Sequence, residues 1–184
     1  MNLARYSCLT LLLACGGHSS GTTGSGSASI NGTVSGQALA TSDTIGVSGT
    51  TTDNGPVQPV AGAIITNVGN VCGILQHDGN PASSEVLYVR VVGASGVVGV
   101  GKYMLNGAGG VGGAVSLLVQ DQSCNPTVQS TATQGSITLT TVSSSTIAGS
   151  FDVTFPTGDH VTGTFSGPIC TFSTSGDAAT PTCQ

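Results

Sequence analysis

Apolar residues occur along this chain in short runs, and Gly, Pro, Asn and Asp separate these runs from Ile30 onward. No stretch keeps the period of about 3.6 residues that marks an amphipathic helix, and Gly, which disfavours helices, is frequent throughout. The pattern therefore predicts short β-strands joined by turns. The expected strands span residues 29–34, 44–48, 61–67, 71–76, 85–92, 97–105, 114–120, 135–142, 148–155 and 161–166.

The segment 85–92 carries apolar residues at both its odd and its even positions. Side chains alternate between the two faces of a strand, so this segment is predicted to be a central strand that is covered on both faces. We expect an all-β fold, either a single antiparallel β-sandwich or a partly closed β-barrel of about 8–10 strands. The sequence leaves the choice between these two open.

The strongest local pattern is a pair of Gly-x-Phe segments that end at Phe151 and Phe165. A hairpin that places Phe155 opposite Val161 and Phe151 opposite Phe165 keeps the apolar residues of both strands on one face. This register implies a five-residue loop over residues 156–160. The repeated segment is then explained by hairpin symmetry.

Composition limits the classes of partner. Hydrophobic residues make up 38% of the chain and charged residues only 6%, and the recurring Val, Ile and Thr favour a sheet over disorder. Outside the first 14 residues the only cations are Arg90 and Lys102, against eight acidic residues. Two cations cannot form a phosphate-binding surface, so we expect no nucleic-acid partner.

The N-terminus has the features of a secretory signal. Arg5 precedes an apolar stretch, residues 9–14, that is too short to span a bilayer. Ala14 directly before Cys15 resembles the lipobox of bacterial lipoproteins. This resemblance implies cleavage between Ala14 and Cys15 and attachment of diacylglycerol to the Cys15 sulfur, so the expected partner is membrane lipid. Gly16 is not the aspartate that in this family marks inner-membrane retention, which implies the outer membrane of a Gram-negative cell.

Three segments follow from this: a signal peptide over residues 1–14, a lipidated Cys15 with a tether over 15–29, and a β domain over 30–184. The tether is almost wholly Gly, Ser and Thr, a composition typical of a flexible coil. The C-terminal third, with GSITLT at 135–140, GSFDVTF at 149–155 and GDHVTGTF at 158–165, resembles uncharacterised lipoproteins of Gram-negative predatory soil bacteria. That resemblance also implies a surface lipoprotein and assigns no activity.

Four cysteines remain once Cys8, in the signal, and Cys15 are set aside: Cys72, Cys124, Cys170 and Cys183. An even number in an exported chain predicts disulfides, for which three pairings are open. We favour Cys72–Cys124 with Cys170–Cys183. No Cys-x-x-Cys pair is present, which argues against a zinc site.

The possible catalytic and cofactor patterns are weak. Residues 107–112 match Gly-x-Gly-x-x-Gly, but a strand-like segment follows where a dinucleotide site needs a helix, so we expect a loop between two strands. His77-Asp78 and Asp159-His160 lie in turn-rich segments, and their aspartates are interpreted as turn residues. Outside the predicted tether, no Gly-x-Ser-x-Gly elbow is present for a serine nucleophile.

A carboxylate pair for sugar hydrolysis could join, for example, Glu85 with Asp121 or Asp152, but the chain has no Trp to form a sugar platform. Tyr88 and Tyr103 are interpreted as packing residues. We therefore expect no catalytic, metal or cofactor site, and a non-enzymatic surface lipoprotein that acts as a structural or partner-binding module. The alternative is a β-barrel-like carrier of a small apolar ligand, for which small inward residues such as Gly99 and Gly101 would leave room.

Overall fold

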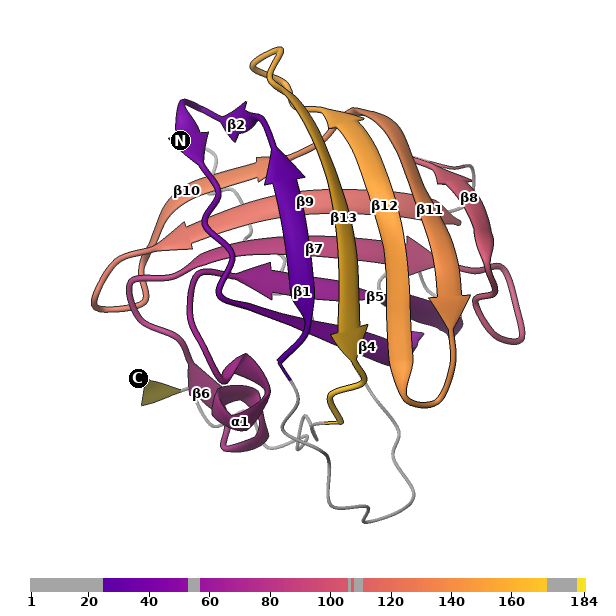
Figure 1. The fold of residues 1–184 in the computed structure, drawn as a ribbon, viewed down its shortest axis with the longest axis horizontal. Helices are drawn as coiled ribbons and strands as arrows, with labels where there is room; N and C mark the ends of the chain where they lie inside the picture. The colour runs from indigo at the N-terminus through magenta and orange to yellow at the C-terminus, as the bar shows by residue number, and fades with distance from the viewer. Residues whose placement is uncertain (1–24, 53–56, 106, 108–110, 172–181) are drawn as a thin grey trace, which may run out of the picture.

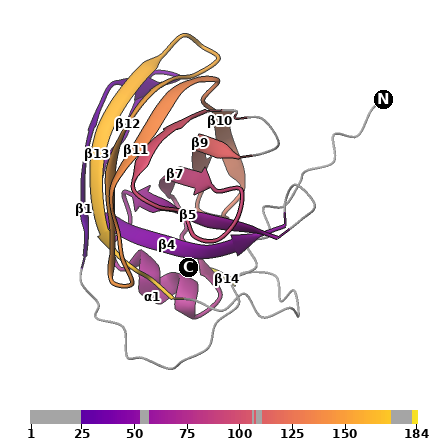
Figure 2. The same ribbon diagram turned by 90° about the vertical axis from the view of Figure 1, so that its right-hand side faces the viewer.

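The computed structural model describes residues 25–52, 57–105, 107, 111–171 and 182–184. The fold is all-β: two five-stranded antiparallel sheets lie one over the other (Figure 2), and neither closes into a barrel, consistent with a β-sandwich. The strands of the two sheets cross at a steep angle (Figure 1), as in orthogonal sheet packing. The predicted fold class is confirmed.

The front sheet of Figure 1 has the order β1-β13-β12-β11-β8, and the back sheet has the order β10-β9-β7-β5-β4. The front strands are β1 (Ser27–Asn31), β13 (His160–Pro168), β12 (Thr146–Thr154), β11 (Gln134–Val142) and β8 (Gly101–Met104). The back strands are β10 (Pro126–Thr131), β9 (Gly112–Gln120), β7 (Glu85–Val92), β5 (Gln58–Thr66) and β4 (Asp43–Thr51). The short elements are β2 (Thr33–Val34), β3 (Gln37–Ala38), α1 (Val71–Gln76), β6 (Gly79–Asn80) and β14 (Thr182–Cys183).

Most of the expected strands are present, with ends that differ by a few residues. The strand β7 has the predicted bounds and lies in the middle of the back sheet, so the central-strand prediction is confirmed. Only Gly101–Met104 of the expected strand 97–105 is a strand. The strand β10 and the short β3, β6 and β14 were not predicted, because their sequences are polar or only two residues long.

The segment predicted as a strand at 71–76 is the helix α1 instead. Asn70 precedes it in the left-handed conformation (φ 58°), and the Asp43 carboxylate accepts a hydrogen bond from the Val71 N–H at 2.9 Å. Val71 and Leu75, four residues apart, pack on one apolar cluster. A short, mostly apolar segment such as residues 71–75 does not distinguish a strand from a helix by its period, which explains the error.

Two apolar clusters stabilise the fold. The main core fills the space between the sheets with inward side chains such as Leu87 and Leu117 from the back sheet and Ile137 and Phe155 from the front sheet, all at most 2% exposed. A second cluster lies between α1 and the back sheet and includes Ile45, Ile64, Val71, Val86 and Cys170. With clusters on both sides, all nine residues of β5 are buried.

The hairpin of β12 and β13 keeps the predicted face but not the predicted register. Phe151 lies opposite Gly163, not Phe165, and Phe165 lies opposite Gly149. A Cβ on Gly163 would stand 2.5 Å from the Phe151 ring, so the missing side chain makes room for the ring. Five residues do separate the paired Thr154 and His160, one position earlier than expected.

The four predicted cysteines are all paired, but the favoured pairing is wrong. The disulfides are Cys72–Cys170 and Cys124–Cys183, with Cα–Cα distances of 5.7 and 5.8 Å. After β13 the chain crosses to the edge of the back sheet, where the Cys170 N–H donates to the Gly46 carbonyl at 2.9 Å. That crossing brings Cys170 to α1, and no spacing in the sequence reveals it.

The predicted tether ends too late, because Ser27–Ser29 already belong to β1, which pairs with β13. The predicted signal peptide, Cys15 and the tether up to residue 24 lie outside the described residues. No helix in the described ranges is long and apolar enough to cross a membrane.

Candidate functional site

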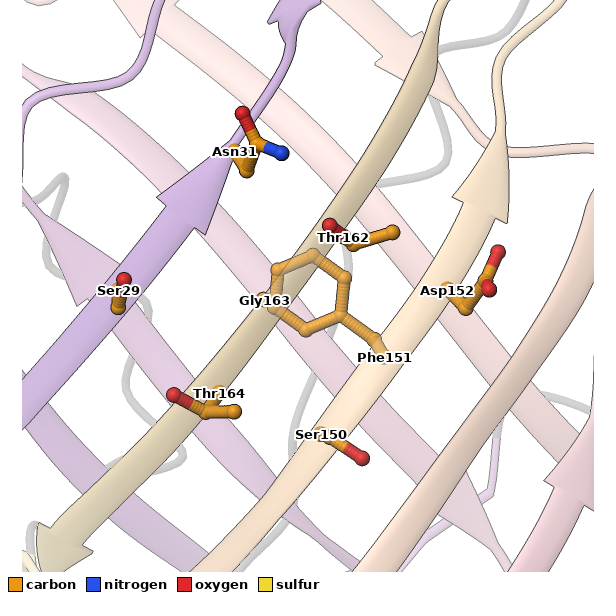
Figure 3. A pocket seen from close by; sticks show the side chains of 8 residues that line it. All are labelled: Ser29, Asn31, Ser150, Phe151, Asp152, Thr162, Gly163 and Thr164. Atoms are coloured by element: carbon orange, nitrogen blue, oxygen red, sulfur yellow. The ribbon is translucent and has the colours of Figure 1, made fainter.

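The outward surface of the front sheet carries short polar side chains across three neighbouring strands. A shallow depression of about 340 Å³ lies among them (Figure 3). Ser29 and Asn31 of β1, Thr162 and Thr164 of β13, and Ser150 and Asp152 of β12 supply its polar groups, and we call these six residues the hydroxyl face. Gly163 and the almost fully buried Phe151 complete its lining.

The hydroxyl face follows from strict alternation along the strands. In β13, Val161 and Phe165 are buried in the core, while Thr164 between them points outward and is exposed. The register continues this order across the sheet, because Thr164 lies opposite Ser29 on one side and Ser150 on the other. Side chains directly opposite each other on antiparallel strands stand about 5 Å apart, so the polar groups form one continuous surface.

A histidine and an aspartate meet at the border of this surface. The His160 Nε2–H donates to the Asp152 Oδ1 at 2.8 Å, with the two side chains 60% and 70% exposed. Water competes for an interaction this exposed, so it contributes little to stability. It also lacks the water-excluded surroundings in which acid–base and electrostatic catalysis are effective.

Asp159, next to His160 in sequence, takes part in a turn and not in that pair. Its Oδ2 accepts hydrogen bonds from the Thr157 hydroxyl at 2.6 Å and from the Ser35 N–H at 2.8 Å. These two bonds, that of Thr157 first, lower the pKa of Asp159 below its usual value. The interpretation of Asp159 as a turn residue is confirmed.

The second histidine also has a structural contact. The His77 Nδ1–H donates to the Gly73 carbonyl at 2.7 Å, one turn back in α1. Asp78 follows in the left-handed region with φ 53°, as a turn requires. Neither His–Asp sequence pair therefore forms a dyad within itself.

The Gly-x-Gly-x-x-Gly segment lies between two strands, as predicted. Residues 108–110 lie outside the described residues, but β8 precedes the segment and Gly112 begins β9 where a dinucleotide site needs a helix. Gly112 has φ 137°, and a Cβ there would stand 2.7 Å from the Met104 carbonyl oxygen. The glycine is required by this close approach of two chain segments.

The remaining candidate side chains have structural partners. The Asp121 Oδ1 accepts hydrogen bonds from the N–H groups of Asn125 (2.9 Å) and Ser123 (2.8 Å). These bonds lower the pKa of Asp121, and the bond from Asn125 has the larger effect. Burial raises the pKa of Tyr88, and the Tyr103 hydroxyl donates to the Gly99 carbonyl at 2.8 Å.

The third carboxylate of the candidate sugar-hydrolysis pairs, Glu85, accepts the Ala40 N–H at 3.4 Å. Within the described ranges, no three His, Cys, Asp or Glu side chains lie close enough together to hold a metal ion.

The sequence did not predict the contact between Asp152 and His160. In the predicted register Asp152 lies two residues farther along β13, opposite Thr164, whereas it lies opposite Thr162 in the structure. Part of the hydroxyl face can be predicted from the sequence, since the pattern Thr162-x-Thr164-x-Ser166 places three hydroxyl groups on one face of a strand.

Comparison with known proteins gives no functional assignment. No protein-family model matches the chain, and neither a curated protein nor a solved structure does.

Proposed function

We propose that this chain is an exported lipoprotein, held through an acylated Cys15 in the outer membrane of a Gram-negative cell. The observation that carries the proposal is the Leu-Ala-Cys sequence at residues 13–15 after a short apolar stretch. The two disulfides support export, because disulfides form and persist in oxidising compartments and are rare in the cytosol. Full lipoprotein modification supplies more than one acyl chain, as stable anchoring requires.

The β domain behind this anchor is proposed to be a non-enzymatic binding module. The hydroxyl face supports this role, because its hydroxyl, amide and carboxylate groups donate and accept hydrogen bonds over a shallow surface. A polar partner at the cell surface can match such groups without a deep cleft. The exposure of Asp152 and His160 favours binding over catalysis.

The alternative, a carrier of an apolar ligand, has less support. Large side chains occupy the inner faces of both sheets, among them Leu117 in the back sheet and Phe151 and Phe165 in the front sheet, each at most 3% exposed. The small residues expected to leave room point elsewhere: a Cβ on Gly99 would contact nothing within 4 Å, and Gly101 only the Tyr103 ring. A packed interior favours a solid core over a ligand cavity.

Metabolic labelling with a radioactive fatty acid tests the anchor. We expect label in the wild-type chain and none in Cys15→Ser, because the serine oxygen does not replace the acylated sulfur. The matched control is Cys8→Ser, which removes a cysteine from the same region and should keep the label. Label that persists in Cys15→Ser would refute the proposed anchor, and labelled protein outside the outer-membrane fraction would refute the location.

A further inference from the structure

Four large apolar side chains are strongly exposed in the described part of the chain: Val57 (67%), Val97 (88%), Val100 (64%) and Met104 (60%). All four lie at the end of the back sheet where β7 ends and β5 and β9 begin. Val97 and Val100 belong to the connection from β7 to β8, at the right of Figure 1, and Val57 directly precedes β5. Met104 ends β8, next to the start of β9 at Gly112.

The connection over residues 93–100, which we call the Val97 loop, is held in place by specific contacts. The Gly93 N–H donates to the Pro59 carbonyl at 2.9 Å, and Val98 is only 5% exposed. The Tyr103 hydroxyl donates to the Gly99 carbonyl at 2.8 Å. Buried Val98 therefore fixes the loop while Val97 and Val100 on either side of it point outward. Apolar groups that are held in position lose little conformational entropy when they bind.

The chemistry of the loop limits what can cover it. Residues 93–101 contain no charged side chain, and Lys102 and Tyr103 follow immediately. Aliphatic side chains beside a tyrosine and a lysine are typical of segments at the membrane–water interface. The chain as a whole is acidic, with a formal charge of −5, so the contact must be apolar and not electrostatic.

The size of the patch argues against a second copy of the chain as the occupant. Four partly exposed Val and Met residues amount to only a few hundred Å² of apolar surface. A stable dimer buries about 800 Å² on each partner. A bilayer needs no complementary surface, so a small protruding group of aliphatic side chains is sufficient for it.

We propose that the Val97 loop is a membrane contact, in which Val97 and Val100 insert into the interface of a phospholipid bilayer. The loop goes beyond the proposed acyl anchor, because it would fix how the domain lies on the membrane.

The length of the chain allows both contacts with the same bilayer. Ser25 hydrogen-bonds to Asp43 at the start of β4, the end opposite the loop, and nine strand residues span about 30 Å. Residues 15–24 reach at most about 35 Å when extended.

The absence of tryptophan from the chain permits a direct test. Residues 15–184 carrying Cys15→Ser, which removes the acylation site, are combined with Val97→Trp and mixed with phosphatidylcholine vesicles. We expect the tryptophan emission to move to shorter wavelength. The matched control is Gln129→Trp, at an exposed position on the far edge strand β10, where we expect no shift. Vesicles that also contain phosphatidylglycerol should give no larger shift, because the chain is acidic, and added salt should not weaken the binding.

Vesicle sedimentation of the same non-acylated chain measures how much membrane binding is lost when the two valines are replaced. Val97→Ser with Val100→Ser should lower the partition coefficient by at least about tenfold, because two aliphatic side chains no longer leave water. Gln129→Ser should not change it. An unshifted Val97→Trp spectrum, or equal shifts at Val97 and Gln129, would overturn the proposal. A dimer in sedimentation equilibrium that the two serines abolish would also overturn it, in favour of a second copy. None of these outcomes depends on whether Cys15 is acylated.

Discussion

Replacing Gly163 with alanine tests the contact that accompanies the register of β12 and β13. Gly163 lies opposite Phe151, and the ring occupies the space that a side chain on residue 163 would take (Figure 3). The new Cβ would stand 2.5 Å from the Phe151 Cζ and 2.8 Å from the Ser29 carbonyl oxygen. We therefore expect the substitution to destabilise the front sheet at the point where β1, β13 and β12 meet.

The size of the effect follows from how little these neighbours can move. An ordinary contact begins at 3.4 Å, so the Phe151 ring would have to shift by about 0.9 Å, although it is only 3% exposed. The Ser29 oxygen belongs to the backbone of the paired strand β1. Overpacking of this kind destabilises a protein by about 1–3 kcal/mol. Alanine also lowers the backbone entropy of the unfolded chain relative to glycine, which stabilises the folded state by about 0.5 kcal/mol. We expect a net loss of about 1.5 kcal/mol in the free energy of unfolding.

Urea unfolding of the unreduced chain, followed by circular dichroism, measures this loss. The control is Gly99→Ala, because a Cβ there meets nothing within 4 Å, and it should leave stability within about 0.5 kcal/mol of wild type. In a double-mutant cycle, Phe151→Leu should reduce the cost of Gly163→Ala, since a smaller side chain relieves part of the clash. A Gly163→Ala variant as stable as Gly99→Ala would contradict the register and the packing described above.

Two further predictions concern the disulfides and Tyr88. Peptide mapping without reduction should recover Cys72–Cys170 and Cys124–Cys183, and a peptide joining Cys72 to Cys124 would contradict the fold. Cys72–Cys170 closes a loop of 98 residues, so its removal should lower the free energy of unfolding by about 4 kcal/mol. Burial raises the folded-state pKa of Tyr88 above the unfolded value near 10, so its contribution to stability is complete below that pH and is lost as pH rises through the folded pKa. Unfolding measured against pH should show that loss in wild type and less of it in Tyr88→Phe; equal alkaline losses would refute the effect.

Alternation in the sequence determines which face a residue occupies, and this is why the strands were largely predictable. The strand β7 has apolar residues on both faces, and only a central position covers both. Alternation does not determine register. A slip of one residue moves every side chain to the other face, but a slip of two keeps all of them on the correct face. The hairpin differs from its prediction by such a two-residue slip, and only the fit of Phe151 over Gly163 resolves it.

The candidate site was less predictable because it depends on contacts between distant segments. The pair of Asp152 and His160 follows from the register, and the hydroxyl face requires β1 to lie beside β13, about 130 residues later in the chain. The exposed residues Val97 and Val100 were expected inside a strand, because an aliphatic run in a sequence gives no sign of whether another element covers it. Asp78, Asp159 and the Gly-rich segment were interpreted correctly because turn chemistry is local.

The disulfides bear on the proposed export through the elements that they stabilise. The helix α1 has six residues, fewer than an isolated helix needs, and β6 and β14 have two residues each. Cys72–Cys170 joins α1 to the segment after β13, and Cys124–Cys183 joins β14 to the turn after β9. These elements lie outside the main core, so burial between the sheets does not hold them. In a reducing compartment they would lose their covalent links, and an oxidising compartment is therefore favoured by an argument that is independent of the N-terminal resemblance.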